Sequence, residues 1–364
     1  MNLTERLDAV IDAALWSRIV GCVVLVNRNG ERVYARAAGY ADREAERPVV
    51  ENEIFRLASV TKPIVATTAL VMLDRGLLSL DDAVSTYLPY FTPKAPDGTT
   101  PAITIRQLLT HTSGLTYDIP DDVSRGSDNG ELMPLTENLR RLTRAPLAFT
   151  PGTRWEYGMS IDVLGGVLAA INRSDLETVV AKYVTGPLGM ADTHFFVTDK
   201  SRIATPYADG EEGPPVRMGE PHPRPNEFLG KDEYFSPARI FEPKAPQSGG
   251  SGMAGTAPDL MKLLEAIRAG DLLAPATRNM AIANQIGDLP RDDAGQTFSF
   301  LGAYIEDTHA SGWPVEGMLH WGGVWGNNWI FEPKSGTCVV VYTNTTLEGC
   351  NGPFREEVRD AVFA

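Results

Sequence analysis

The spacing of hydrophobic residues changes from helical to strand-like near the start of the chain. Between Asn2 and about Ser17, apolar residues recur every three or four positions, which predicts an amphipathic helix. A continuous valine-rich run follows at 19–26, and a second strand-like stretch extends from Glu31 to Tyr40. A turn sequence that ends in Gly30 separates the two runs, so together they predict a β-hairpin.

Several later segments combine the apolar periodicity of helices with a recognisable start. A helix predicted from Ser59 to Arg75 ends at Gly76, and Pro63 falls in its first turn, where a missing N–H costs little. Other helices are predicted where a capping-box pattern precedes a periodic apolar run. These patterns are Thr104-x-x-Gln107, Ser174-x-x-Glu177 and Thr256-x-x-Asp259.

Strand-like runs return toward the C-terminus, at 298–305, 317–321, 328–331 and 337–342, between predicted helices at 257–269 and 353–364. Strands near both ends with a helix-rich middle predict an α/β (α+β) fold. We expect a mainly antiparallel sheet, built from both termini and flanked by helices, plus an inserted helical domain. The sheet domain is assigned to 1–76 and 250–364, and the mostly helical insert to 77–249.

The segment from Thr205 to Gln247 has no clear period. It contains nine prolines in 43 residues and many charges. We interpret it as a long, irregular, Pro-rich loop over the surface of the inserted domain.

The charge balance narrows the possible partners. Lys and Arg total 33 against 47 Asp and Glu, a formal net charge of −14, which argues against nucleic acid and anionic membrane surfaces. No apolar run approaches the ~20 residues that span a bilayer, and no signal peptide is visible, so we expect a cytoplasmic protein without a membrane partner. We expect Cys22 and Cys338 to be small buried hydrophobes. The sequence leaves the oligomeric state undefined.

Ser59-Val-Thr-Lys62 is the only S-x-x-K pattern in the chain, at the start of a predicted helix. Residues i and i+3 lie on one helix face, so the ammonium can approach the hydroxyl. A lysine buried there could take the serine proton or assist a neighbouring base. The alternative is an N-cap serine followed by a solvated lysine. No G-x-S-x-G or HExxH pattern is present, and we expect no metal or organic cofactor.

Two further places could complete a catalytic site. Tyr157 precedes a helix predicted near Ile161, where a phenol can project into a cleft and, beside an ammonium, act as a general base. The alternative role for Tyr157 is packing against Trp155. Gly322 and Gly323 adjoin an apolar strand, where exposed backbone N–H groups could stabilise an oxyanion. The alternative there is a tight turn or bulge.

In this order, the three places resemble the serine β-lactamase and DD-peptidase superfamily. Within it, the chain is most similar to the family VIII carboxylesterases, relatives of class C β-lactamases, over nearly its whole length. The matching stretches are Phe55-Arg-Leu-Ala-Ser-Val-Thr-Lys-Pro-Ile64, Leu108-Leu-Thr-His-Thr-Ser-Gly-Leu115, Pro187-Leu-Gly-Met190, Trp321-Gly-Gly-Val324 and Val341-Tyr-Thr-Asn344.

The resemblance implies a role for individual residues. Ser59 matches the acylated nucleophile, Lys62 the lysine paired with it, and Tyr157 the tyrosine that acts with this lysine as general base. The backbone N–H groups of Ser59 and Val324 match the oxyanion hole. The substrate-binding positions that it implies are Trp321, Gly322, Gly323 and, as a further cleft aromatic, Tyr117.

Two departures from class C β-lactamases bear on the substrate. Met159 stands where those enzymes have an asparagine, and Trp321-Gly322-Gly323 stands where they have Lys-Thr-Gly. Replacing a cation with an indole removes a charge partner for an anionic substrate. The departures therefore favour a neutral ester over a β-lactam.

Other aromatic and histidine residues are assigned no catalytic role. On a strand, Trp325 and Trp329 would share one face, and some tryptophans could line the cleft. We expect His111 to have a capping or packing role, whereas His320 lies beside the third motif and could touch the cleft.

We predict a serine carboxylesterase that hydrolyses short-chain esters through an acyl-enzyme on Ser59, with a small-molecule ester as its partner. Three alternatives stay open. They are a β-lactamase or D-amino-acid peptidase, an acyltransferase of the same fold, and a non-catalytic binding protein.

Overall fold

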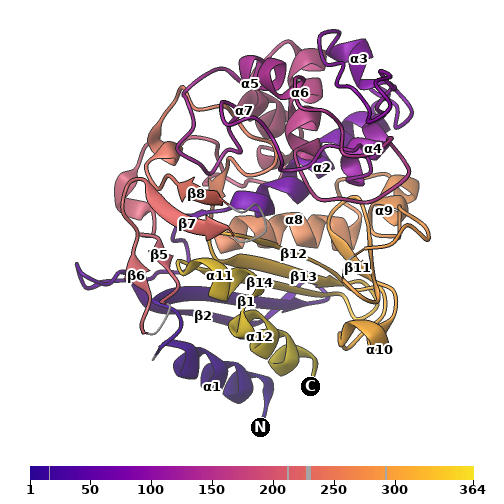
Figure 1. The fold of residues 1–364 in the computed structure, drawn as a ribbon. Coiled ribbons are helices and arrows are strands. Elements are labelled where there is room, and N and C mark those ends of the chain that lie inside the picture. The colour runs from indigo at the N-terminus through magenta and orange to yellow at the C-terminus, as the bar shows by residue number, and fades with distance from the viewer. Residues whose placement is uncertain (16, 211–212, 227–230, 292) are drawn as a thin grey trace.

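The computed structural model describes residues 1–15, 17–210, 213–226, 231–291 and 293–364 (Figure 1). Its centre is an eight-stranded sheet in the order β10-β11-β12-β13-β14-β1-β2-β3, with antiparallel pairing between neighbours. The strands are β1 (Gly21–Arg28), β2 (Glu31–Asp42), β3 (Arg47–Pro48), β10 (Gln296–Phe298), β11 (Ala303–Ile305), β12 (Leu319–Gly323), β13 (Asn327–Glu332) and β14 (Thr337–Thr343). Because β1 pairs with β14, both ends of the chain build the sheet, as predicted.

Helices cover both faces of the sheet (Figure 1). On one face, α1 (Leu3–Leu15) lies beside α12 (Pro353–Phe363), and Cys22, Val24 and Val26 of β1 pack into the same apolar cluster. Val23 and Leu25 point into the larger core on the other side, where α8 (Ala257–Ala269) lies. Burial on both faces explains the continuous apolar run of β1. Cys22 and Cys338 are free and buried, which confirms their predicted role as core residues.

A helical layer lies above the larger core (Figure 1). Its central helix, α2, is buried from Thr61 to Met72, as expected of a helix that is apolar on all sides. The helices of this layer are α2 (Thr61–Asp74), α3 (Val84–Tyr87), α4 (Ile105–Leu109), α5 (Leu135–Leu142), α6 (Ser160–Asn172) and α7 (Leu176–Val180). The remaining short helices are α9 (Pro275–Ala281), α10 (Thr308–Ser311) and α11 (Thr346–Asn351).

The predicted helix starts are confirmed at two of three positions. Thr104 forms a complete capping box with Gln107, and the Thr256 side chain accepts from the Asp259 N–H in the first turn of α8. Ser174 is wrong as a cap, because Asp175 caps α7 instead. Glu177 does not turn back to the helix start, since its carboxylate accepts from the Phe195 N–H and contacts His194.

Two segments differ from their predicted secondary structure. The segment 205–247 is not an irregular loop throughout, because it forms two hairpins: β5 (Tyr207–Ala208) with β6 (Val216–Arg217), and β7 (His222–Asn226) with β8 (Lys231–Phe235). Isolated two-stranded ribbons consist only of edge strands, which tolerate proline. The run 298–305 is two strands, because Ser299 Oγ accepts the N–H groups of Leu301 and Gly302 and closes a turn.

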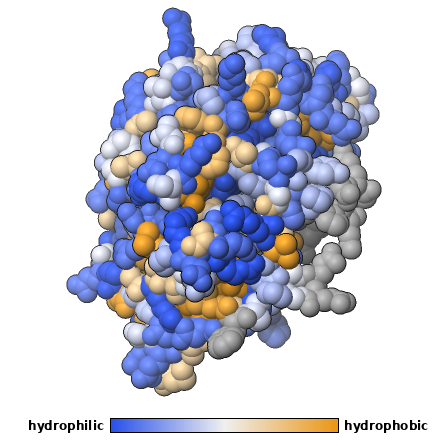
Figure 2. Space-filling model, turned by 90° about the vertical axis from the view of Figure 1, so that its left-hand side faces the viewer, coloured by the Kyte–Doolittle hydropathy of each residue, from blue (hydrophilic) through white to orange (hydrophobic). Residues whose placement is uncertain are grey.

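The face that carries β5–β8 is mostly hydrophilic, with small apolar patches between polar groups (Figure 2). Among the described residues, no helix combines the length and apolar character needed to cross a membrane.

Candidate active site

Ser59 lies on a tight turn where the sheet side of the molecule meets the helical layer. The short strand β4 (Phe55–Arg56) pairs with β9 (Ala254–Gly255), and the 3-10 turn Ala58–Val60 leads directly into α2. Ala58 has φ +43°, in the left-handed region that residues with a Cβ rarely adopt. Such strain beside a reactive residue is characteristic of functional sites, because the surrounding packing must hold it.

Lys62 is buried in the first turn of α2 and points back at Ser59. Its Nζ lies 3.1 Å from Ser59 Oγ, 2.8 Å from the Gly250 carbonyl oxygen and 3.2 Å from the Tyr117 hydroxyl. Its exposed fraction is 4%, and no side chain caps α2. The alternative of a capping serine with a solvated lysine is therefore wrong.

Tyr157 reaches the same hydroxyl from the loop before α6. Its OH lies 2.7 Å from Ser59 Oγ, and Lys62 Nζ lies 4.5 Å from the centre of its ring. The ring packs against His111 and Trp321, with centroids 4.8 and 5.0 Å away. Ser59, Lys62 and Tyr157 thus form one hydrogen-bonded cluster, which the sequence could only suggest.

The third motif runs along β12 beside this cluster. Trp321 donates its indole N–H to the Tyr157 hydroxyl over 3.3 Å. A Cβ on Gly323 would lie 2.1 Å from the Leu57 carbonyl oxygen, so only glycine allows β12 to approach the Ser59 turn this closely. Gly322 faces the other way, since a Cβ there would lie 3.0 Å from Cys350 Sγ. Val324 follows directly, and its side chain packs near Ala58.

Tyr117 is a second phenol in the site and accepts the Lys62 hydrogen bond. Its ring lies edge-on to Tyr157, with centroids 5.4 Å apart. Burial, and then the neighbouring Tyr157, raise the pKa of Tyr117 well above the ordinary value for tyrosine. Tyr117 therefore stays protonated, which makes it a polar partner for Lys62 rather than a base.

The residues that support Lys62 from behind were not predicted from the sequence. Asp162 on α6 is buried and accepts from the Ser248 hydroxyl and, over 3.3 Å, from the Gly250 N–H. The same Gly250 peptide offers its carbonyl to Lys62. Burial raises the Asp162 pKa, and the Lys62 charge opposes that shift. No sequence motif links these residues, because their proximity arises from chain segments far apart.

The two histidines differ in position. His111 packs among Tyr157, Trp155 and Phe298, and burial lowers its pKa well below the ordinary value, so it is neutral. This confirms the predicted packing role. His320 does not touch the cleft: it is buried on the opposite side of β12 and stacks on Trp313 at 3.9 Å between ring centres.

The prediction that Trp325 and Trp329 share a strand face is wrong. Trp325 lies in the turn before β13 and packs with Ala58, whereas Trp329 is inside the strand and belongs to the large core. Within the described ranges, no group of three or more His, Cys, Asp or Glu side chains is placed to hold a metal ion.

Comparisons with known proteins show the family of the chain. The family model described as Beta-lactamase matches residues 7–361. The chain is 45% identical to Esterase EstB of Burkholderia gladioli, over 100% of this chain and 96% of that protein. It is 27% identical to the Lovastatin esterase of Penicillium rubens, over 92% and 91% of the two chains.

Solved structures show the same likeness. "EstCE1, a hydrolase with promiscuous acyltransferase activity" superimposes with a TM-score of 0.91 at 38% identity, covering 100% of this chain and 98% of that one. A penicillin-binding protein homologue from Pyrococcus abyssi shares the fold at 20% identity, with a TM-score of 0.77, over 100% and 77% of the chains. The chain belongs to the beta-lactamase family. It is a serine hydrolase of that fold, and its resemblance to the esterases among these enzymes is confirmed.

Proposed function

We propose that the protein is a carboxylesterase that hydrolyses small, neutral, short-chain esters through an acyl-enzyme on Ser59. The observation that carries this proposal is the convergence on one hydroxyl: Tyr157 OH at 2.7 Å and Lys62 Nζ at 3.1 Å from Ser59 Oγ. A nucleophile within hydrogen-bond reach of a base, which is oriented by a third group, is the arrangement that covalent catalysis needs.

In the first step, Tyr157 takes the Ser59 proton as Oγ attacks the ester carbonyl. The positive charge of Lys62 offsets the negative charge that develops on the tyrosine oxygen, and the Trp321 N–H donates to the same oxygen. The N–H groups of Ser59 and Val324 hold the oxyanion. Tyr157 then returns the proton to the departing alcohol, which leaves an acyl group on Ser59. A water molecule then attacks the acyl group by the same steps, with Tyr157 taking its proton. This releases the acid and restores Ser59.

The residues at the two positions that differ from class C β-lactamases favour a neutral substrate. Met159, which replaces the asparagine of class C β-lactamases, has an exposed fraction of 0% and belongs to the core. Trp321 turns its only polar group toward Tyr157. Arg291 is a cation near this indole, but its guanidinium lies 4.4 Å from the Trp155 ring centre and donates to the Thr297 carbonyl oxygen. These contacts support ester cleavage over β-lactam or D-amino-acid peptide cleavage.

The test is steady-state hydrolysis of p-nitrophenyl acetate, butyrate and octanoate beside nitrocefin. We expect ester turnover that Ser59→Ala abolishes and nitrocefin turnover that is feeble by comparison. Ser335→Ala, at an exposed turn, is the matched serine control and should keep full activity. Near-wild-type activity in folded Ser59→Ala would contradict the mechanism, and strong nitrocefin turnover would move the protein to the β-lactamases. If a serine-directed phosphonate failed to label Ser59, a non-catalytic binding role would replace the proposal.

Acyl transfer to an alcohol is a second candidate, supported by the EstCE1 structure, whose description includes promiscuous acyltransferase activity. The same acyl-enzyme serves both outcomes. Partition between acid and new ester, measured with and without an added acceptor alcohol, distinguishes them.

A further inference from the structure

An apolar cluster that includes Ala58 adjoins the Ser59 turn. It contains Ala58, Met218, Phe235 and Trp325, with Val324 packed against it. Phe235 and Trp325 lie with ring centres 4.9 Å apart, and their exposed fractions are 6% and 4%. We propose that Met218, Phe235 and Trp325 form the wall that limits the acyl chain of the substrate, and that Arg56 positions this wall. This inference rests on the proposed esterase function.

The chemistry of the reaction assigns this wall to the acyl side. The departing alcohol must receive its proton from Tyr157, so the alcohol lies toward Tyr157 and Trp321. The carbonyl oxygen lies between the N–H groups of Ser59 and Val324. The acyl chain takes the remaining direction, toward the cluster, because Ala58 directly precedes Ser59 and the Val324 side chain packs against the same cluster. Because Met218, Phe235 and Trp325 are already packed together there, the space for the chain is short.

Two hairpins bring Met218 and Phe235 to the nucleophile, whereas Trp325 comes from the turn before β13. Met218 directly follows β6, and its N–H donates to the Pro206 carbonyl oxygen over 3.1 Å. Phe235 ends β8. Met218 and Phe235 are therefore supplied by a segment more than a hundred residues away from Ser59 in the sequence.

Arg56 connects this segment to the nucleophile turn, three positions before Ser59. Its Nη1 donates to the Ala204 carbonyl oxygen over 2.9 Å, and its Nε and Nη2 donate to the Pro237 carbonyl oxygen over 2.9 and 2.6 Å. These carbonyls flank the two hairpins at either end. The guanidinium also lies 5.7 Å from the Trp325 ring centre. Burial lowers the pKa of Arg56 to about 10, so the group stays charged at neutral pH.

Glu220 holds the same end of the segment from its other side. Its carboxylate accepts from the Ser236 hydroxyl over 2.7 Å and from the Ala238 N–H over 2.6 Å. Arg56 and Glu220 therefore bind opposite polar groups of one turn, whose central residue is Pro237. This arrangement fixes Phe235, which directly precedes the turn.

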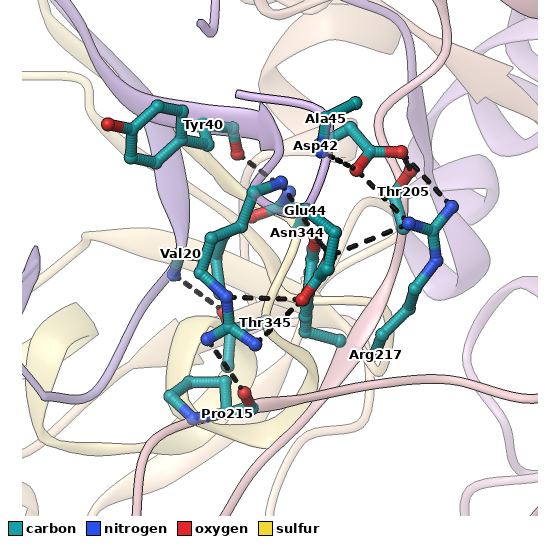
Figure 3. Close-up of polar contacts among 12 residues, drawn as sticks. Val20, Tyr40, Asp42, Glu44, Ala45, Thr205, Pro215, Arg217, Asn344 and Thr345 are labelled. Carbon is teal, nitrogen blue, oxygen red and sulfur yellow. Dashed lines mark hydrogen bonds and ion pairs between the residues drawn. The ribbon is translucent and has the colours of Figure 1, made fainter. Parts of the chain in front are cut away.

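A polar network anchors the first hairpin to the sheet edge (Figure 3). Asp42 accepts from the Thr205 hydroxyl over 2.8 Å and from Arg217 over 3.1 Å, and Arg217 also contacts Glu44. With Met218 directly after Arg217, the network holds the wall in place from outside. The segment is therefore fastened at both ends and along its first hairpin, as a wall that selects by size requires.

The direct test is acyl-chain selectivity, measured as kcat/KM for p-nitrophenyl acetate, butyrate, hexanoate and octanoate. Met218→Ala and Phe235→Ala should raise the octanoate-to-acetate ratio by about tenfold or more. An apolar pocket that becomes deeper by a few methylene groups changes the preference between substrates by at least that factor. Tyr234→Ala is the matched control, since this aromatic residue beside Phe235 is exposed and should leave the ratio unchanged. Unchanged ratios in both wall variants would overturn the proposal.

A second series keeps the acetyl group and varies the alcohol. The wall variants should leave the ratio of kcat/KM for 1-naphthyl acetate to that for p-nitrophenyl acetate within about twofold of wild type. A changed alcohol profile with an unchanged acyl profile would place the wall on the leaving-group side and overturn the assignment.

Arg56→Lys tests the positioning residue, because lysine keeps the charge but cannot reach both carbonyls. We expect a raised octanoate-to-acetate ratio, carried by KM, with kcat for acetate within about threefold of wild type. An equal loss of kcat for every ester would show that Arg56 only supports the nucleophile turn. Should this variant fail to fold, Glu220→Gln loosens the same turn from its other side and is expected to shift the ratio likewise. Absence of Ser59-dependent hydrolysis in the wild type would instead refute the proposed function itself.

Discussion

The Tyr157 hydroxyl lies 2.7 Å from Ser59 Oγ, although the two residues are separated by 98 positions in the chain. The contact joins the start of α2 to the loop before α6, two helices that pack against each other in the helical layer. His111 and Trp321 hold the ring from two sides, so the phenol is oriented before any substrate binds. Such preorganisation is what makes a base effective in the transition state.

Tyr157→Phe should lower kcat for p-nitrophenyl butyrate by about 10²- to 10⁴-fold, the usual contribution of a positioned proton-transfer group. KM should change little, because the ring and its packing remain. Tyr304→Phe on β11 removes a hydroxyl outside the cluster and serves as the control. A Tyr157→Phe enzyme with more than a tenth of wild-type kcat would show that Lys62 alone takes the proton.

Trp321→Phe should reduce kcat by up to about tenfold, because it deletes one hydrogen bond to the Tyr157 oxygen and keeps most of the ring. The reduction should be absent in a Tyr157→Phe background, where that oxygen no longer exists. Additive effects in this double-mutant cycle would mean that the indole acts on the substrate directly.

Gly323→Ala should lower kcat/KM by more than about a hundredfold, because a misplaced catalytic group commonly costs that much. The new methyl group would lie 2.1 Å from the Leu57 carbonyl oxygen and push β12 away from the Ser59 turn. Gly213→Ala, where a Cβ meets no atom of the described residues within 4 Å, should be neutral. Retained activity in a folded Gly323→Ala protein would mean that the turn can shift without harm to the site.

The His194–Glu177 pair gives the fold a pH-dependent contribution. The hydrogen bond that the His194 ring donates to the Glu177 carboxylate raises the pKa of His194 above its ordinary value, so the folded state binds this proton more tightly than the unfolded state. The resulting stabilisation is fully present below about pH 6.5 and is lost as pH rises through the folded pKa.

Urea unfolding of wild type and His194→Gln at several pH values measures this contribution. The difference in free energy of unfolding should shrink as pH rises from 6 to 9. The trend should be weaker in a Glu177→Gln background, because the largest contribution to the raised pKa is gone while the Ala191 carbonyl and Asp192 remain. A difference that grows with pH in the native background would contradict the assigned direction.

Local sequence patterns predicted much of the fold. The predicted helix at 257–269 matches α8 residue for residue, and the apolar runs at both ends became the central strands of one sheet. The proximity of Ser59 and Lys62 was also accessible, because residues three apart share a helix face regardless of the rest of the protein. Hydrophobic periodicity and helical spacing are local properties, so the sequence carries them directly.

The tertiary structure decided everything that depends on distant segments. It buried Lys62 against the Gly250 carbonyl, placed Asp162 behind that peptide, and turned His320 away from the cleft. It also made 205–247 into hairpins that bring Met218 and Phe235 beside Ala58. These contacts form because the packing of whole elements selects them, and a stretch of sequence read alone does not contain its partners. The sequence by itself determined which groups can react, and the fold determined what surrounds them.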